Sequence, residues 1–157
     1  MDELMYHRIL VPLEHTDTDA AIVEHVRQLA RESRGSVVLI HVADGWAARN
    51  ANSLTLRESE EMRVDREYLE SIADRFEADG IEVECVLAGG DPASEIAAAA
   101  QREVCDLIAM STHGHRFIKD VIYGSVANEV RHLSRIPVLL VRGDREPPAK
   151  ISTIKSP

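Results

Sequence analysis

Residues Cys105-Asp-Leu-Ile-Ala-Met110-Ser-Thr-His-Gly114 run from an apolar segment directly into a glycine turn. The apolar part, Asp106 to Met110, has the length of a β-strand and lacks the alternation of apolar and polar residues that a half-exposed strand has. Such a run is typical of a strand that helices cover on both faces of a parallel sheet. We therefore expect a buried parallel strand that ends at Met110.

Four further short runs rich in Val, Ile and Leu have the same character: Arg8 to Leu13, Val37 to Val42, Ile81 to Leu87 and Ile136 to Val141. Helices are expected between the runs, because apolar residues there recur with a helical period. Their expected ranges are Asp17 to Arg34, Thr55 to Asp79, a segment that opens at Asp91-Pro92, and about Ser125 to Leu133.

The ends of these helices carry recognisable signals. Thr16 or Asp17 is expected to cap the first helix, and Gly35 to end it in a left-handed turn. Thr55-Leu-Arg-Glu58 is a capping-box pattern, Gly80 is expected to stop the second helix, and Pro92 suits the first position of the third. The residues expected to face the core are Ile22, Val26, Leu29, Ala30, Met62, Leu69, Ile72, Ala73, Phe76, Ile96, Ala97, Ala100, Val126, Val130 and Leu133.

Strands and helices thus alternate along the whole chain. Right-handed crossovers then place helices on both faces of an open parallel sheet, so the fold class is a doubly wound α/β sheet of five parallel strands. Residues 1–143 are expected to form one domain and residues 144–157 a loose tail. The segment Asp44 to Ser53 is expected to be a long loop.

Composition excludes several classes of function. The 157-residue chain has a formal net charge of −9, which disfavours nucleic-acid partners because its field repels polyphosphate. It lacks an apolar run long enough to span a membrane, so we expect no membrane insertion and a cytoplasmic protein. Cys85 and Cys105 both lie in apolar runs and are expected to be reduced and buried.

A ligand site is expected beyond the carboxyl ends of the strands, where the strand order reverses. The segments to inspect are Pro12 to Thr16, Val42 to Gly45 and Met110 to Ser125. The third is locally basic, with His113, His115, Arg116 and Lys119, and it ends at Gly124-Ser125, where a helix begins. Because a helix N-terminus and closely approaching glycine backbone favour anions, this segment fits a polyphosphate.

Taken together, these residues resemble the universal stress protein family. Gly114, nine residues and Gly124-Ser125 reproduce the latter part of the family's phosphate motif. Ile9-Leu-Val-Pro12, Val38-Leu-Ile-His-Val42, Gly90-Asp-Pro-Ala-Ser-Glu-Ile96, Cys105 to Met110 and Ile136 to Val141 resemble its strands and turns. The resemblance runs from about Tyr6 to Arg142.

That resemblance implies strand order 3-2-1-4-5, the adenine nucleotide alpha-hydrolase-like arrangement, and a site for ATP, AMP or ADP. Pro12 and Val42 would border the adenine, Met110 and Ser111 would lie beside adenine and ribose, and Mg²⁺ would accompany a triphosphate. It also implies a homodimer through the last strand, Ile136 to Val141, which otherwise leaves an open sheet edge. The full set of expected nucleotide-binding residues is Pro12, Leu13, Glu14, His41, Val42, Met110, Ser111, His113, Gly114, His115, Arg116, Gly124, Ser125 and Val126.

Three positions depart from the family pattern. Glu14 stands in place of the family's Asp, His15 in place of a Gly, and Ser111 in place of the first Gly of the phosphate motif. Each adds atoms near the expected ligand.

Simpler roles stay open for several of these residues. Ser125 would cap a helix rather than act as a nucleophile, and Glu14 would support a helix N-terminus as readily as contact a ligand. Gly124 could be a turn residue only, and Arg116 could be merely solvated. His41 could be a hydrogen-bonded core histidine, and no third ligand adjoins His113 and His115 to complete a metal site.

Three functions are therefore compared. The first is a nucleotide-binding, stress-response regulator that works as a homodimer. The second is a dimeric interaction module that binds no nucleotide. The third, a true hydrolase or nucleotidyl transferase, is least favoured, because no Gly-rich loop ending in Lys-Ser or Lys-Thr and no residue placed to orient water is evident.

Overall fold

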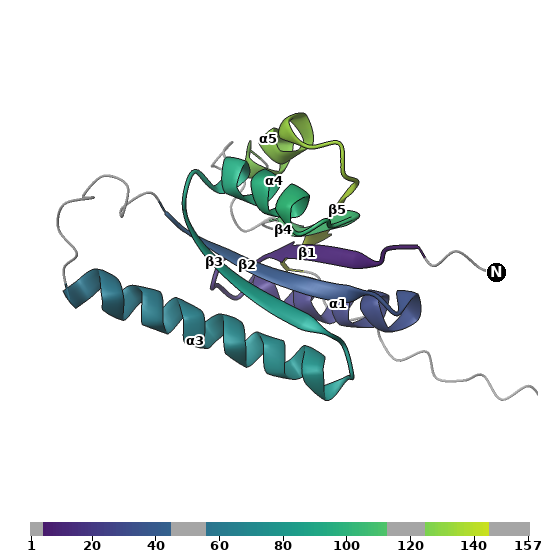
Figure 1. Ribbon diagram of the computed structural model, residues 1–157, viewed down its shortest axis with the longest axis horizontal. Coiled ribbons are helices and arrows are strands. Elements are labelled where there is room, and N and C mark those ends of the chain that lie inside the picture. The colour runs from purple at the N-terminus through teal and green to yellow at the C-terminus, as the bar shows by residue number, and fades with distance from the viewer. Residues whose placement is uncertain (1–4, 45–55, 113–124, 145–157) are drawn as a thin grey trace, which may run out of the picture.

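A computed structural model describes residues 5–44, 56–112 and 125–144 of the chain. These residues form a five-stranded parallel sheet with strand order β3-β2-β1-β4-β5, as expected (Figure 1). The strands are β1 Arg8–Pro12, β2 Ser36–Asp44, β3 Val83–Gly90, β4 Leu107–Thr112 and β5 Val138–Arg142. The helices are α1 Asp19–Ser33, α3 Leu56–Ala78, α4 Pro92–Arg102 and α5 Ser125–Leu133.

The helices cover the sheet in two layers. α1 and α3 lie on one face, and α4 and α5 lie on the other (Figure 1). Successive residues of a strand point to opposite faces, so Ile9 and Val11 of β1 join the α1–α3 layer and Leu10 joins the α4–α5 layer. Burial on both faces explains why the strand sequences lack polar alternation.

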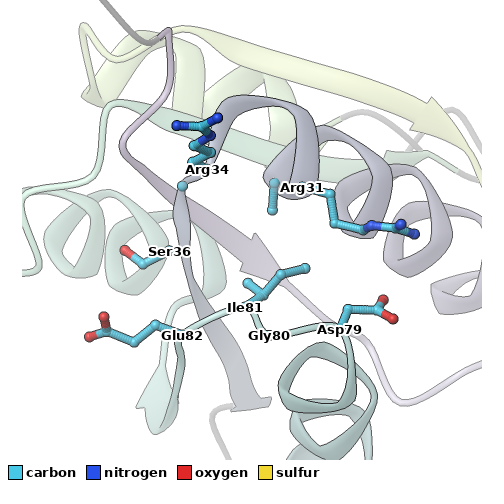
Figure 2. Close-up of a pocket in the computed structure, with 9 residues that line it drawn as sticks. Arg31, Arg34, Ser36, Asp79, Gly80, Ile81 and Glu82 are labelled. Atoms are coloured by element: carbon cyan, nitrogen blue, oxygen red, sulfur yellow. The ribbon is translucent and has the colours of Figure 1, made fainter.

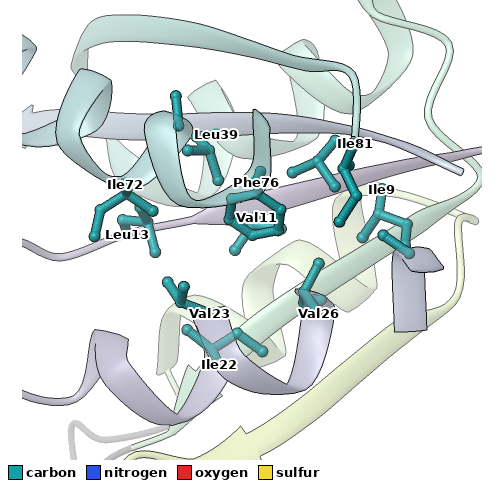
Figure 3. Packing of buried hydrophobic residues seen from close by; sticks show 14 of the residues in the cluster. Ile9, Val11, Leu13, Ile22, Val23, Val26, Leu39, Ile72, Phe76 and Ile81 are labelled. Atoms are coloured by element: carbon teal, nitrogen blue, oxygen red, sulfur yellow. The ribbon is translucent and has the colours of Figure 1, made fainter. Parts of the chain in front are cut away.

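The larger of the two apolar clusters forms under α1 and α3. Phe76 of α3 is fully buried there and faces the side chains of α1 and β1 (Figure 3). Leu69, Ile72 and Ala73 are buried with it, as expected. Met62 is not, because it is 43% exposed on the amino-terminal half of α3, which extends past the packed part of the helix (Figure 1).

The smaller cluster forms under α4 and α5. Ile96, Ala100 and Val130 are buried in it as expected, and Ala93 and Ala99 join them. Ala97 is only partly buried. Leu133, expected in the core, is 58% exposed because it is the last residue of α5 and lies beyond the buried Val130.

The ends of α1 differ from expectation at both positions. Its left-handed C-terminal residue is Arg34, with φ of 53°, and not Gly35. Gly35 is instead needed because it has no side chain: a Cβ there would lie 2.5 Å from the carbonyl oxygen of Tyr6. At the start, the N-cap residue is Thr18, and neither Thr16 nor Asp17 caps the helix.

The other helix ends that can be compared follow the sequence signals. Gly80 is left-handed after α3, with φ of 75°. Asp91 caps α4 by accepting the N–H of Ser94 over 3.0 Å, and Pro92 is the first residue of that helix. Thr55, the residues 45–53 of the expected long loop, and the tail residues 145–157 lie outside the described part of the chain.

The two cysteines have different surroundings. Cys105 is buried at 6% exposure, as expected. The expectation for Cys85 is wrong, since it is exposed on β3. β3 is an edge strand, and none of its residues is fully buried. An apolar run in the sequence therefore does not show that helices cover both faces of the strand. Both thiols are free.

Candidate nucleotide site at the carboxyl ends of β1 and β4

The pairing between β1 and β4 ends early on the carboxyl side. Register pairs join β1 to β2 as far as Pro12 and Ile40, and β4 to β5 as far as Thr112 and Arg142. Between β1 and β4 the pairs stop at Leu10 and Ile108. β1 and β4 are also the strands on either side of the reversal in strand order. Ligands of doubly wound sheets bind at this position.

Three of the expected site residues are brought together on the α4–α5 side of this point. Met110 is buried at 6% exposure at the end of β4. Val42 of β2 and Val126 of α5 are partly buried and pack against the same cluster as Met110. They supply an apolar surface of the kind that holds a flat aromatic base.

Ser125 is the first residue of the nine-residue helix α5, and it is exposed. The N-terminal amides of such a helix, together with its dipole, favour a negatively charged group. The expected phosphate residues His113, Gly114, His115, Arg116 and Gly124 lie outside the described residues.

Ser111 and His41, on the other side of the sheet, are engaged with the protein itself. The Oγ of Ser111 donates a hydrogen bond to the carbonyl oxygen of Thr18 over 3.1 Å. The Nδ1 of His41 lies 2.8 Å from the carbonyl oxygen of Leu13. The chain at Pro12 and Leu13 therefore runs beside the end of β2, where the N–H of Leu13 also donates to the carbonyl oxygen of Ile40.

The turn between β1 and α1 is organised around Asp19, a residue that the sequence did not single out. Asp19 is 2% exposed. Its carboxylate accepts the backbone N–H of Glu14 over 3.0 Å, of His15 over 2.8 Å and of Thr16 over 3.4 Å. These amides of the turn before α1 are therefore already bonded to an anion that the chain supplies.

The Tyr68 hydroxyl of α3 is a fourth donor to Asp19, over 2.6 Å. Burial, and then the hydrogen bond to the Asp19 carboxylate, raise the pKa of Tyr68, so the phenol stays neutral. His15 stacks on the Tyr68 ring with centroids 4.0 Å apart. The His15 side chain, which stands where the family has a Gly, thus points toward α3.

Glu14 is exposed, and its Oε2 lies 3.5 Å from the hydroxyl of Thr18, the N-cap residue of α1. This position agrees with the simpler of its two expected roles, support of the helix start, and leaves a ligand contact untested.

Asp19 had a signal in the sequence. It lies three and four residues before Ile22 and Val23, on the buried stripe of α1. A carboxylate on the apolar stripe of a helix must find donors in the interior, so this spacing marks Asp19 as a buried acceptor. Asp65, four residues before buried Leu69 on α3, is a partly buried carboxylate, with a side chain that is 18% exposed.

A separate hollow of about 460 Å³ lies at the opposite, amino-terminal end of the sheet. Its lining includes Arg31, Arg34, Asp79 and Glu82 around Ile81. Figure 2 shows the guanidinium groups of Arg31 and Arg34 pointing away from Ile81. α1 and α3 both end here, so their carbonyl ends face this region and make it a poor match for an anionic ligand.

Comparison with known proteins gives the family of the chain. The Universal stress protein family is matched over residues 5–142. The chain belongs to the universal stress protein family. Within the family, it is 29% identical over 159 residues to the universal stress protein MJ0577 of Methanocaldococcus jannaschii, covering 88% of this chain and 96% of that one. It is 26% identical over 148 residues to the universal stress protein YxiE of Bacillus subtilis, covering 88% and 100%.

Solved structures of universal stress proteins have the same fold. The structure of MJ0577 superposes with a TM-score of 0.76 at 28% identity, covering 91% of this chain and 99% of that one. A universal stress protein in complex with cAMP gives a TM-score of 0.64 at 18% identity, with coverage of 88% and 98%. One from Archaeoglobus fulgidus in complex with dAMP gives 0.63 at 18% identity, with the same coverage.

Proposed function

We propose that this chain is a cytoplasmic nucleotide-binding regulator of the stress-response type, with ATP as the favoured ligand and a homodimer as its working unit. Membership of the universal stress protein family supports the general role. Two structural neighbours were solved with cAMP and with dAMP, which share an adenine base and a phosphate. These shared groups are the ones that an ATP site would recognise first.

The observation that carries the proposal is the end of β1–β4 pairing at Leu10 and Ile108, beside the apolar residues Val42, Met110 and Val126. In this proposal the adenine lies against these three side chains. The phosphates lie toward the amino end of α5, where Ser125 begins the helix.

The turn after β1 would have only a minor part in phosphate binding. The amides of Glu14, His15 and Thr16 already bond the Asp19 carboxylate, which would also repel a phosphate group. The proposed phosphate donors are therefore the residues from Gly114 to Val126, where the sequence is locally basic.

The described residues do not supply a magnesium site of their own. Residues 5–44, 56–112 and 125–144 contain no group of three His, Cys, Asp or Glu side chains arranged to hold a metal ion. Since Mg²⁺ is commonly held by substrate phosphates and water, we propose that it binds only with a triphosphate.

Equilibrium titration with a fluorescent ATP analogue tests the ligand site. Val42→Glu places a charge on the proposed adenine surface, and Gly124→Val places a Cβ beside the proposed phosphates. Each is expected to weaken binding about tenfold or more, equivalent to about 1.4 kcal/mol. Val64→Glu is the matched control, because Val64 is 43% exposed on α3, which packs on the face of the sheet opposite to Val42, Met110 and Val126.

Saturable binding that ATP, AMP or cAMP displaces, and that Val42→Glu and Gly124→Val but not Val64→Glu weaken, supports the proposal. Absence of binding by the unmutated protein overturns it and favours the alternative, a dimeric interaction module of the same fold. Equal loss in all three variants would also contradict the proposed site.

The homodimer is proposed through β5, the sheet edge opposite β3. Leu140 of this strand is 47% exposed, and an unpaired apolar edge invites a second copy. Size-exclusion chromatography with light scattering is expected to give a dimer for the unmutated protein and a monomer for Leu140→Asp. A monomeric unmutated protein at micromolar concentration would contradict this part of the proposal.

A further inference from the structure

The edge of the sheet opposite β5 is the outer side of β3. Within the described residues, β3 pairs only with β2, in an unbroken parallel register from Val83 opposite Val37 to Gly90 opposite Asp44. The N–H and C=O groups on its outer side have no strand partner in this part of the chain. An eight-residue strand therefore offers a long row of hydrogen-bonding groups to another extended chain.

β3 lacks most of the features that protect an edge strand from pairing. It contains no proline and no lysine, and its one-to-one register with β2 contains no bulge. Its only charged side chain is Glu84, which bonds the guanidinium of Arg8 on β1, two strands away. The edge is thus open to pairing, and its surroundings determine which kind of chain can pair with it.

Acidic side chains lie along this edge on the side of α3, the helix that packs against β3 (Figure 1). Glu70, Asp74 and Glu77 have the i, i+4, i+7 spacing that places them on one side of the helix, and all three are exposed. Partial burial raises the pKa of the Cys85 thiol, and the charges of these three carboxylates raise it further, so they lie close to the middle of β3. None of them forms an ion pair with a residue of the described ranges, which leaves their charges for a partner.

The side chains of β3 alternate between the two faces of the sheet. Val83 and Leu87 pack against the cluster under α1 and α3, and Cys85 lies between them on the same face. Val86 and Ala88 pack against the cluster under α4 and α5. A strand added to this edge continues both faces, so every second one of its side chains lies on the face of Cys85 and the acidic residues of α3.

We propose that the outer edge of β3 binds an extended, basic segment of a partner protein by β-strand addition. Backbone hydrogen bonds to β3 supply the pairing, and lysine or arginine at alternate positions of the added strand meets Glu70, Asp74 and Glu77. The same carboxylates disfavour a second copy of this chain as the occupant. Two β3 edges paired antiparallel would bring both acidic rows together, and like charges repel.

This surface is separate from the proposed nucleotide site and from the proposed dimer interface. The nucleotide site lies where β1 and β4 part, and the dimer forms through β5, at the other end of the strand order. A homodimer therefore carries two β3 edges that its own contact leaves open. The proposal does not rest on nucleotide binding, and its tests use no nucleotide.

Fluorescence anisotropy with a labelled synthetic peptide of alternating lysine and valine tests the binding. The unmutated protein is expected to bind it saturably, and more weakly as salt rises, because exposed charges are screened. A peptide with glutamate in place of lysine is expected not to bind. A peptide with proline in place of valine keeps the charge but loses backbone donors, and is expected to bind about tenfold more weakly or worse. Absence of binding by the lysine–valine peptide, or equal binding of the lysine–proline peptide, would overturn the proposal.

Charge reversal on α3 tests the part played by the acidic row. The double variant Glu70→Lys with Glu77→Lys is expected to weaken binding of the lysine–valine peptide about tenfold or more. The matched control is Glu32→Lys with Glu129→Lys, which changes the net charge equally at two exposed positions. Glu32 is on α1, which packs against β1, β4 and β5, and Glu129 is on α5, on the other face of the sheet. Equal losses in the two double variants would contradict a partner that lies beside α3.

Hydrogen exchange measured by NMR tests the contact with the backbone of β3 itself. Successive residues of a strand direct their N–H groups to opposite edges, so the lysine–valine peptide is expected to slow exchange at alternate residues from Val83 to Gly90. It is also expected to slow the reaction of the exposed Cys85 thiol with a chromogenic disulfide reagent. A bound peptide that changes neither rate would be held by charge alone, and strand addition would be refuted.

Discussion

Arg8 and Asp106 are joined by two hydrogen bonds that run in opposite directions. The N–H of Arg8 donates to Oδ1 of Asp106 over 3.0 Å, and the N–H of Asp106 donates to the carbonyl oxygen of Arg8 over 2.9 Å. The guanidinium of Arg8 also bonds Glu84 and Glu103. The amino end of the β1–β4 junction is therefore closed, whereas pairing stops two residues later, toward the candidate site.

Asp106→Asn is expected to weaken the acid dependence of stability. Burial raises the pKa of Asp106, but the backbone N–H groups of Arg8 and His7 outweigh it and hold that pKa below its ordinary value. A carboxyl with a lowered pKa in the folded state stabilises above its unfolded pKa, and the stabilisation is lost as pH falls through the folded value.

Urea unfolding between pH 7 and pH 2.5 measures this effect. Asp106→Asn should be less stable than the unmutated protein at pH 7, with a difference that shrinks toward pH 2.5. Glu70→Gln removes an exposed carboxylate of α3 and serves as the control. A difference that stays constant over the whole range would contradict the prediction.

Phe76→Ala is expected to cost about 3–5 kcal/mol, because it removes a fully buried ring from the cluster under α1 and α3. Met62→Ala on the same helix should change stability by about 0.5 kcal/mol or less, since Met62 is 43% exposed. Chemical denaturation of both variants checks the pair. Similar losses would mean that α3 packs along a different face.

Gly35→Ala is expected to destabilise by about 1–3 kcal/mol, because the new Cβ would meet the backbone oxygen of Tyr6 at 2.5 Å. Gly89→Ala is the control, because nothing lies within 4 Å of a Cβ at that position. Thermal unfolding should separate the two variants clearly. If Gly35→Ala is neutral, the approach of residue 6 to the end of α1 is looser than the structure has it.

Thiol titration with a chromogenic disulfide reagent should distinguish the two cysteines in the native protein. Cys85 is exposed as a residue and should react, but slowly, because partial desolvation of the thiol and the nearby charges of Glu70, Glu77 and Asp74 raise its pKa. Burial raises the pKa of Cys105 to about 11, so it should react only after unfolding. Cys85→Ser should abolish the native reaction. Two thiols reacting together at one rate would contradict the assignment.

The sheet was predictable because its signal is strong and local. Apolar runs such as Leu107 to Met110 and the alternation of strands with helices leave few arrangements, and the family resemblance supplied the strand order. The helix ends were less predictable. Gly35 was expected to supply a left-handed residue, yet Arg34 adopts that conformation and Gly35 is needed for its small size.

The exposed ends of elements account for most of the wrong burial assignments. Met62 and Leu133 have the correct helical spacing for the core, but Met62 lies in the amino-terminal half of α3 and Leu133 is the last residue of α5, and both are exposed. Cys85 lies in an apolar run whose strand is at the sheet edge. Periodicity indicates which side of an element is apolar, and it does not indicate how far the neighbouring layer reaches.

The sequence led us to inspect the carboxyl ends of the strands, but it did not predict the side-chain pairing found there. Val42, Met110 and Val126 lie in one cluster, as the expectation for a shared site requires. The contacts of His15 and His41 with Asp65 join residues 50 and 24 positions apart. Such pairing depends on the placement of α3 over the sheet, which no local pattern specifies.

The bonding of Asp19 also has a consequence for how the free protein behaves. Covalent attachment keeps this carboxylate at a high local concentration beside the amides of Glu14, His15 and Thr16, so solutes compete for them only weakly. The start of α1 should therefore keep one shape in buffers of very different anion content. The geometry of this turn is thus set by the chain itself and not by the ions of the solution.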